Sequence, residues 1–313
     1  MLMGMQKKLQ FLSALFLFVS PILAEAQWIN VGPPSFTPNQ ADFPGISLDA
    51  NGIPYLVFRD QGAGAKASVM NYNGSSWNFI GNRGISDGDA YTPRLCFNHL
   101  QNPFIAYMDR TDSNKATVMR FAGNVWKLVG SRGFTKSAAS FESIVIDAYG
   151  TPYVAFRDLY HDYRASVMKF DGNDWDYVGA PAFSPVGNGY DGAAYTTLSF
   201  DRNGTLYISF CDVVNNFLAT VMKFDGSGWV YVGNPGFASW NADYTNALAF
   251  DSQNTPYLVC SAGGKAAVKK FDGTNCVFLG QAGFSPGAVD FASLVIDQNT
   301  NTPYVTLAMY QWT

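Results

Sequence analysis

Short runs of apolar residues recur along the chain and are separated by turns rich in Gly, Asn and Asp. In one such run, Val154 and Phe156 point to one face of an extended strand, and Tyr153 and Ala155 point to the other. Both faces are therefore apolar, as required of a sheet sandwiched between two others, because a half-exposed sheet would alternate apolar and polar positions. Aromatic and β-branched residues are abundant, and no helix-period stretch follows residue 26. The pattern predicts an all-β fold whose sheets bury one another.

A repeat of about 49 residues organises these strands. The sequence WDYVG at 175–179 recurs at 28–32, 77–81, 126–130 and 229–233, and a copy without its Trp, CVFLG, stands at 276–280. Successive copies are 49, 49, 49, 54 and 47 residues apart. Fixed internal periods of this length are the signature of repeat architectures.

Three further strands are expected between successive copies. The first ends in an acid or amide and covers 46–49, 95–98, 144–147, 198–201, 248–251 and 294–297. The second begins at Tyr55, Phe104, Tyr153, Tyr207, Tyr257 and Tyr304, and the third at Ala67, Ala116, Ala165, Ala219 and Ala266. Four short strands in a unit of 40–50 residues form a propeller blade. We predict a six-bladed β-propeller of four-stranded blades, in which the last blade is incomplete and is closed by the N-terminal strand at 28–32.

The first 26 residues have the layout of a secretory signal peptide. Lys7 and Lys8 precede an apolar stretch, and Ala24-Glu25-Ala26 provides a small-x-small cleavage site. We therefore expect residues 1–26 to be removed and residues 27–313 to form a single propeller domain outside the cytoplasm. No later apolar run is long enough to span a bilayer.

The net charge of −4 gives no reason to expect nucleic-acid binding, which needs a basic surface. Of the four cysteines, Cys96, Cys211 and Cys260 fall within or at the ends of expected strands, and Cys276 replaces the repeated Trp. This placement favours buried thiols over disulfides, and Cys260 with Cys276 is the one pair that shares a blade. His99 and His161 lie in different repeats without metal-site spacing, so neither a metal nor a cofactor is expected.

The repeats resemble a family of secreted bacterial repeat propellers. The resemblance rests on GTPYVAFRD at 150–158, ATVMKFDG at 219–226, the WxxVG strand and the Gly-Phe-Ser turns, and it covers residues 28–308. Such proteins often carry a C-terminal sorting domain for type IX secretion. That domain is absent here, and the last blade lacks its third strand, which suggests a truncated chain. The resemblance implies a propeller at or outside the cell surface and no established chemistry. A looser similarity links Asp171-Gly172-x-x-Trp175 to the Asp-box of sialidase propellers.

The spacing between strands differs on the two faces of the predicted ring. The turns between strands 1 and 2 and between strands 3 and 4 are nearly constant in length, whereas the strand 2–3 loops and the blade connections vary. Variable loops are where function collects, so we expect any ligand on that face. The candidate ligand-binding residues there are Arg59, Asp60, Asp109, Arg110, Arg157, Asp158, His161, Tyr190, Asp212 and Trp240. Arg and Asp can bind sugar hydroxyls and aromatic rings can stack on sugars. The alternative is that the Arg-Asp pairs only tie each loop to its neighbour.

Two other acidic features have a structural interpretation. The series Asp49, Asp147, Asp201, Asp251 and Asp297 opens β-turns, where turn chemistry favours Asp. Asp87-Gly88-Asp89 could touch Ca²⁺ but lacks the spacing of a ligand-rich calcium loop.

The sequence favours a binding module over an enzyme. Glu142 is the only glutamate after the leader, whereas glycosidases normally use a pair of carboxylates. Repeated, similar blades suit multivalent weak binding. We expect a secreted or cell-surface binding or adhesion module for glycans or matrix proteins, with no catalytic residue identified. A sialidase-like carbohydrate-active enzyme and a structural spacer of a larger surface protein are the alternatives.

Overall fold

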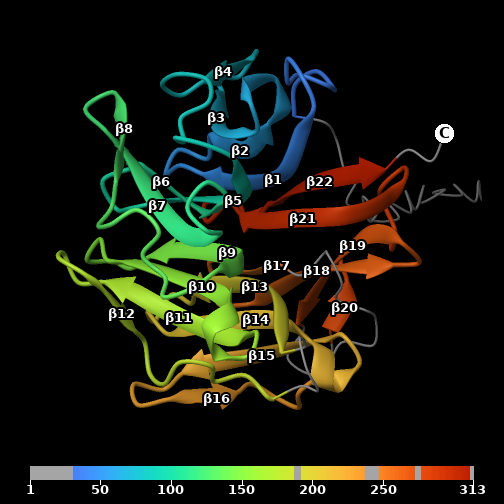
Figure 1. Ribbon diagram of the computed structural model, residues 1–313. Coiled ribbons are helices and arrows are strands. Elements are labelled where there is room, and N and C mark those ends of the chain that lie inside the picture. The colour runs from blue at the N-terminus through green and yellow to red at the C-terminus, as the bar shows by residue number, and fades with distance from the viewer. Residues whose placement is uncertain (1–30, 187–191, 237–246, 272–275, 311–313) are drawn as a thin grey trace, which may run out of the picture.

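The computed structural model describes residues 31–186, 192–236, 247–271 and 276–310, and they form an all-β propeller (Figure 1). Five antiparallel four-stranded sheets follow one another along the chain, and a two-stranded sheet ends it. The first three blades comprise β1 (Ala41–Leu48), β2 (Pro54–Asp60), β3 (Lys66–Tyr72), β4 (Trp77–Phe79), β5 (Ala90–Phe97), β6 (Pro103–Asp109), β7 (Lys115–Ala122), β8 (Val125–Leu128), β9 (Ala139–Ile146), β10 (Pro152–Asp158), β11 (Arg164–Phe170) and β12 (Trp175–Tyr177). The remaining strands are β13 (Ala193–Phe200), β14 (Leu206–Asp212), β15 (Leu218–Phe224), β16 (Trp229–Tyr231), β17 (Ala247–Phe250), β18 (Pro256–Ala262), β19 (Lys265–Phe271), β20 (Cys276–Phe278), β21 (Ala288–Ile296) and β22 (Pro303–Tyr310).

The first strand of each sheet lies toward the middle of the molecule and the fourth at its periphery (Figure 1). Each inner strand packs against the inner strands of the two neighbouring sheets, and β21 packs against both β17 and β1. The backbone N–H of Ile46 in β1 donates to the Ser293 Oγ of β21 at 3.3 Å, and the Thr306 hydroxyl of β22 donates to the Pro44 carbonyl at 3.5 Å. The last sheet therefore closes the ring against the first.

The prediction of six blades is wrong in its count, because the structure has five four-stranded blades. The sheet of β21 and β22 stands at the sixth position and has two strands in the described part of the chain. The expected closing strand at 28–32 lies largely outside the described residues. Its described part, Val31 and Gly32, forms no strand.

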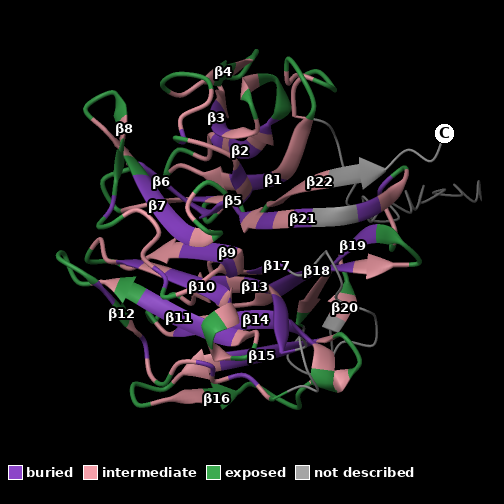
Figure 2. Ribbon diagram, in the orientation of Figure 1, coloured by how far each residue is buried: buried purple, intermediate pink, exposed green. Residues whose placement is uncertain are grey.

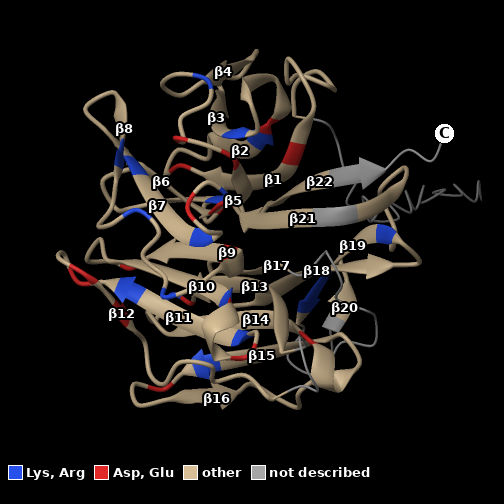
Figure 3. Cartoon of the chain, in the orientation of Figure 1, with Lys and Arg blue, Asp and Glu red and all other residues tan. Residues whose placement is uncertain are grey.

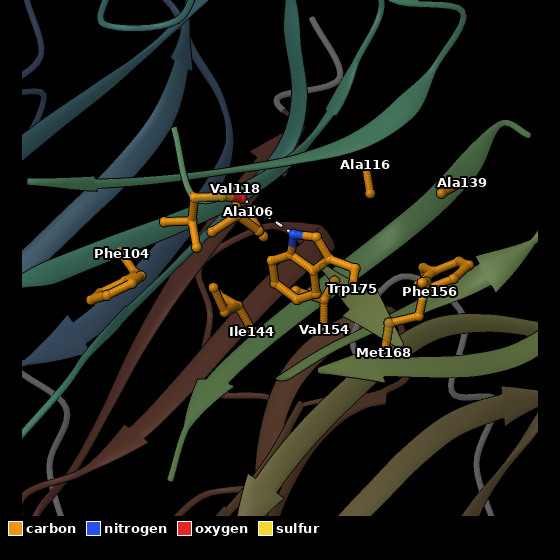
Figure 4. Close-up of a cluster of buried hydrophobic side chains, with 11 residues drawn as sticks. Phe104, Ala106, Ala116, Val118, Ala139, Ile144, Val154, Phe156, Met168 and Trp175 are labelled. Atoms are coloured by element: carbon orange, nitrogen blue, oxygen red, sulfur yellow. Dashed lines mark hydrogen bonds between the residues drawn. The ribbon is translucent and has the colours of Figure 1, made fainter. Parts of the chain in front are cut away.

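In each of the first four blades, the repeated Trp bonds to the preceding copy of the W-x-x-V-G motif. Trp175 Nε1 donates to the Val129 carbonyl, 46 residues earlier, at 3.2 Å (Figure 4). The same bond joins Trp77 to Val31, Trp126 to Ile80 and Trp229 to Val178. The glycine after each of these carbonyls has a positive φ and lies against the indole, so that a Cβ at Gly130 would come within 3.0 Å of Trp175 Nε1. The W-x-x-V-G motif thus supplies both sides of the contact: the Trp of one copy donates to the carbonyl that precedes the Gly of the copy before it.

The aromatic residue of the blade connection completes this joint. Phe134 stacks on Trp175 with ring centroids 4.1 Å apart and planes inclined by 13°. Phe36 stacks in the same way on Trp77, and Phe183 on Trp229. The residue directly after this apolar position makes another repeated contact. The backbone N–H of Ala165 in β11 donates to Ser184 Oγ at 2.9 Å, and Ala116 donates to the Thr135 hydroxyl in the same way.

The core lies between blades rather than within one sheet. Inner and middle strands are largely buried, whereas the outer strands and loops are half-buried or exposed (Figure 2). One cluster brings Phe104 of the second blade together with Ile144, Val154 and Trp175 of the third (Figure 4). The central residues of β10, Val154, Ala155 and Phe156, are buried on both faces of the sheet, as the sequence predicts.

The acid or amide that ends each first strand shapes a tight turn, as predicted. Asp147 Oδ1 accepts the backbone N–H groups of Tyr149 and Thr151, both at 2.9 Å. Asp49, Asn98, Asp201 and Asp251 make the same pair of bonds. No helix in the described part of the chain is long and apolar enough to cross a bilayer.

The cysteines agree with the prediction of thiols as far as they are described. Cys96 is a free thiol on an inner strand, and Cys211 and Cys260 are buried in β14 and β18. The side chain of Cys276 lies outside the described residues, so its pairing with Cys260 stays untested.

We predict that the Trp bond contributes measurably to stability. Trp175→Phe retains an aromatic ring for Phe134 but leaves the buried Val129 carbonyl without its donor, which costs about 1–3 kcal/mol. Urea unfolding would show this loss as a lower midpoint, with Tyr149→Phe, whose ring is 91% exposed, as the matched control. An unchanged midpoint for Trp175→Phe would contradict the role assigned to the motif.

Candidate functional site

The inner strands enclose a channel of about 240 Å³ along the middle of the ring. Its wall is made of residues from β1, β5, β9, β13, β17 and β21, with Gln298 at one end. The strand 2–3 loops and the blade connections lie together at the other end, as the bonds from Ala90 N to the Ala65 carbonyl and from Leu159 N to the Ala138 carbonyl show. We call this end the loop face.

Five inner strands, β1, β5, β9, β13 and β21, carry a bulge where they approach the loop face, and the described strand β17 carries none. The register against the second strand shifts between Asp42 and Gly45 in β1 and between Tyr91 and Arg94 in β5. The bulged residue adopts a left-handed backbone in four sheets, with φ between 48° and 59°: Phe43, Thr92, Phe141 and Tyr195. Bulges re-aim side chains next to functional sites. Here they bring Phe43 within 4.3 Å of Tyr91, and Phe141 within 4.2 Å of Tyr195, between ring centroids.

A buried acid lies at the bulge of β9. Glu142 is completely buried, and its Oε2 accepts the Thr92 hydroxyl of the neighbouring blade at 2.9 Å, whereas its Oε1 has no hydrogen-bond partner. Burial raises the pKa of Glu142 to about 7, against the opposing effects of its own backbone N–H, the Thr92 hydroxyl and the charge of Arg94. Glu142 replaces residues that are Pro44, Pro93 and Thr196 in other blades, so it is a departure from the repeat.

Arg94 is the positive partner of this region. It lines the channel, and its Nη1 donates to the Pro93 carbonyl at 3.0 Å. Burial lowers the pKa of the Arg94 guanidinium to about 10, and the charge of Glu142 opposes that shift. The guanidinium therefore remains charged at neutral pH.

The acids that end the second strands are structural in their contacts. Asp60, Asp109, Asp158 and Asp212 are at most 2% exposed, and each accepts the backbone N–H of the second residue after it. Asp60 also binds Arg83, and Asp109 binds Arg132, with shortest N–O distances of 2.6 and 2.7 Å. The hydrogen bonds from Arg83 are the main reason that the pKa of Asp60 is lowered. Hydroxyls of the third strand, from Ser68, Ser166 and Thr220, hold three of these carboxylates from the other side.

Two of the predicted arginines belong to a charged cluster between the first two blades. We call Asp42, Arg59, Asp89, Tyr91 and Arg110 the rim cluster. Arg59 Nε lies 2.7 Å from Asp89 Oδ1, and its Nη1 lies 3.0 Å from Asp42 Oδ2. Basic and acidic positions of the chain lie close together around β1, β2 and β5 (Figure 3). The Arg110 guanidinium lies 3.6 Å from Asp89 Oδ2 and 4.5 Å from the centroid of the Tyr91 ring. The side chain of Arg110 is 45% exposed.

The remaining predicted residues do not join this cluster. Arg157 stacks on the Tyr163 ring at 4.7 Å, and His161 Nδ1 lies 2.8 Å from Asp158 Oδ2. Tyr190 and Trp240 lie outside the described residues. The structure thus places the predicted residues at several separate points on the loop face, and Arg59 with Arg110 form the one pair that it brings to a shared partner, Asp89.

No cluster of His, Cys, Asp and Glu in the described ranges has the form of a metal site. Asp89 is occupied by Arg59 and Arg110, and Asp87 points to Arg132 at 3.7 Å. A cation at the Asp87-Gly88-Asp89 segment would have to compete with these arginines for the two carboxylates.

Sequence reasoning missed Asp42, Tyr91, Asp89 and Arg94 as partners in one region. The sequence feature that could have identified Arg94 is its departure from the repeat, because it stands where other copies have Gly45, Ser143 or Ser293. The sequence distinguishes Glu142 only as the single glutamate after residue 26.

The chain matches no protein-family model. A search of curated proteins likewise finds no match. Solved structures do resemble it. A lectin in complex with α-methyl fucoside is 16% identical with a TM-score of 0.64, and the match covers 86% of this chain and 89% of the lectin. The α-L-arabinanase of Penicillium chrysogenum, complexed with arabinobiose, is 10% identical with a TM-score of 0.63, covering 88% and 90%. A protein of unknown function from Dyadobacter fermentans is 14% identical with a TM-score of 0.55, covering 81% and 86%. At these identities the likeness shows the propeller fold alone.

We predict that Glu142 makes the protein less stable as the pH rises. Because the pKa of Glu142 is about 7 in the folded state and about 4.5 in the unfolded chain, the folded state binds the extra proton between these values. The free energy of unfolding then falls as the pH rises from about 4.5 through 7, by about 3 kcal/mol in all.

Glu142→Gln removes this titration and flattens the dependence, which urea unfolding at pH 5 and pH 8 would measure. Asp87→Asn, at a side chain that is 73% exposed, is the matched control and keeps the wild-type dependence. A Glu142→Gln protein with the wild-type slope would refute the assignment.

Proposed function

We propose that this propeller is a glycan-binding protein and that the rim cluster is its binding site. The main support for this proposal is that Tyr91, Arg110 and Asp89 lie together on one exposed part of the loop face. Sugars present hydroxyl groups that donate to carboxylates and accept from guanidinium groups, together with C–H faces that pack on aromatic rings. The rim cluster offers all three kinds of partner.

The cluster is preorganised for such contacts. Arg59 is only 13% exposed and holds both Asp42 and Asp89, so these carboxylates are fixed before a ligand arrives. Arg110 and Asp89 remain partly accessible, at 45% and 24% exposure. Fixing polar groups in advance reduces the entropy that binding would otherwise cost.

The fold is compatible with this role, since lectins and glycoside-acting enzymes are among the similar structures. The leader-like segment at 1–26 and the resemblance to secreted repeat propellers support a location outside the cytoplasm, at the cell surface or in the medium. A matrix protein that carries glycans would be a partner of the same chemistry.

A carbohydrate-active enzyme is the second candidate, favoured by the buried Glu142 with its raised pKa. Glycosidases generally need a second carboxylate several ångströms away. Arg94 is the one charged residue among the described residues of the channel wall, so that second carboxylate is not supplied there.

We predict that binding depends on the rim cluster. A glycan array probed with the purified protein identifies the ligand. Arg110→Ala and Tyr91→Ala each then lower the affinity for it about tenfold or more, because each removes a charged or stacking contact worth roughly 1.5–3 kcal/mol. Arg120→Ala, at an exposed arginine on the outward part of β7, is the matched control and binds as the wild type does.

Isothermal titration calorimetry of these three variants with the array ligand provides the measurement. An array without hits would end the proposal of glycan binding. Wild-type affinity in both Arg110→Ala and Tyr91→Ala would remove the rim cluster as the site.

A further inference from the structure

One level of the channel holds a single positive charge among small residues. One residue of each inner strand pairs with the second strand at an equivalent place of the repeat: Gly45, Arg94, Ser143, Thr197, Ala247 and Ser293 pair with Val57, Ala106, Ala155, Ser209, Val259 and Thr306. We call these six residues the Arg94 level. Five of them are Gly, Ala, Ser or Thr, and only Arg94 carries a long side chain. Equivalent positions on six inner strands form one layer around the axis, so the small residues leave room in front of the guanidinium.

The charge of Arg94 is not cancelled by contact with an acid. One of its five N–H groups donates to the Pro93 carbonyl. In the described part of the chain no ion pair within 4.0 Å involves Arg94, although Glu142 is near enough to affect its pKa. Every other described residue of the channel wall is uncharged. A cation in a partly enclosed wall attracts an anion more strongly than one in open water, because the lower dielectric screens it less.

The hydroxyls of this level add directional donors. Ser143 Oγ accepts the Leu198 backbone N–H at 2.9 Å, and Ser293 Oγ accepts that of Ile46 at 3.3 Å. A serine hydroxyl that accepts from the backbone keeps its own O–H for another acceptor. The Arg94 level therefore offers a guanidinium and hydroxyl donors to a single bound ligand.

We propose that the Arg94 level of the channel binds the carboxylate of a sugar acid of monosaccharide size. A guanidinium matches the two oxygens of a carboxylate through parallel N–H bonds, which gives both affinity and orientation. The volume of about 240 Å³ lies below the roughly 300–1,000 Å³ of sites for drug-sized ligands, so it suits one small ring and excludes a chain. The identity of the guest as a sugar rests on the proposed glycan binding, whereas the preference for a carboxylate rests on Arg94 alone.

D-glucuronate and D-glucose are matched probes, since they differ in the carboxylate that Arg94 would hold. Titration calorimetry of the wild type is expected to give at least tenfold tighter binding of glucuronate than of glucose, and the difference narrows as salt is raised. Arg94→Gln abolishes that preference. Arg94→Lys keeps the charge but loses the planar fork, so it retains part of the preference. Arg120→Ala is the surface control and behaves as the wild type.

Glu142→Gln provides a second test that does not remove Arg94. At pH 8 the Glu142 carboxyl is largely ionised and competes for the charge of Arg94, so its replacement is expected to raise the affinity for glucuronate severalfold. If Arg94→Gln does not fold, as judged by its circular dichroism and thermal melting, Glu142→Gln and the salt dependence of the wild type decide the matter.

The outcomes separate this inference from the proposed function. Array glycans that bind through the rim cluster, without any preference for glucuronate over glucose, overturn the channel site and leave glycan binding in place. A glucuronate preference that depends on Arg94, with no array ligand, supports the channel site and ends the rim proposal. Equal weak binding of both probes in wild type and Arg94→Gln overturns the inference outright.

Discussion

The bond from an indole N–H to a backbone carbonyl of the preceding blade is the contact on which the architecture depends. Each sheet has two apolar faces and is unstable alone in water, so it must be held against its neighbours at a fixed distance and tilt. Trp175 does this for the second and third blades by reaching the Val129 carbonyl, while Phe134 covers the ring. The glycine after the carbonyl is required because any Cβ there would meet the indole. At Gly233 the space is open, and the following copy of the motif has Cys276 instead of Trp.

Repetition also explains why so many conspicuous acids are structural. An aspartate that ends a second strand serves the loop of its own blade, and Asp60 and Asp109 are neutralised by an arginine from the following connection. The unusual charged groups occur where one blade departs from the residues shared by the other repeats. Arg94 replaces a small residue and Glu142 replaces Pro or Thr, on adjacent inner strands. Burial shifts the pKa values of both groups in the directions that disfavour charge. Arg94 is the one charged residue among the described residues of the channel wall.

The rim cluster and the Arg94 level lie at the same end of β5 but differ in character. In the rim cluster, two arginines and two aspartates compensate each other, so its recognition would rest on hydrogen bonds and stacking. In the Arg94 level, one charge faces neutral residues, so its recognition would rest on charge. A propeller with both would hold neutral and acidic sugars by different means on one face.

The amino-acid sequence by itself determined the blade, its four strands and its turns. It could do so because several described copies of Trp175, Asp147 and Ala165 make the same contact, so the residues that make it recur at a fixed spacing in the sequence. The number of complete blades, the closure of β21 on β1 and the meeting of Arg59 with Asp89 were decided only by the tertiary structure. The hydrogen bond from Thr92 to Glu142, and the placing of Glu142 near the charge of Arg94, were decided in the same way. These contacts join non-equivalent positions of neighbouring blades, which come together only when the twisted sheets pack into a ring. Because each contact occurs once, it leaves no repeated pattern in the sequence from which it could be predicted.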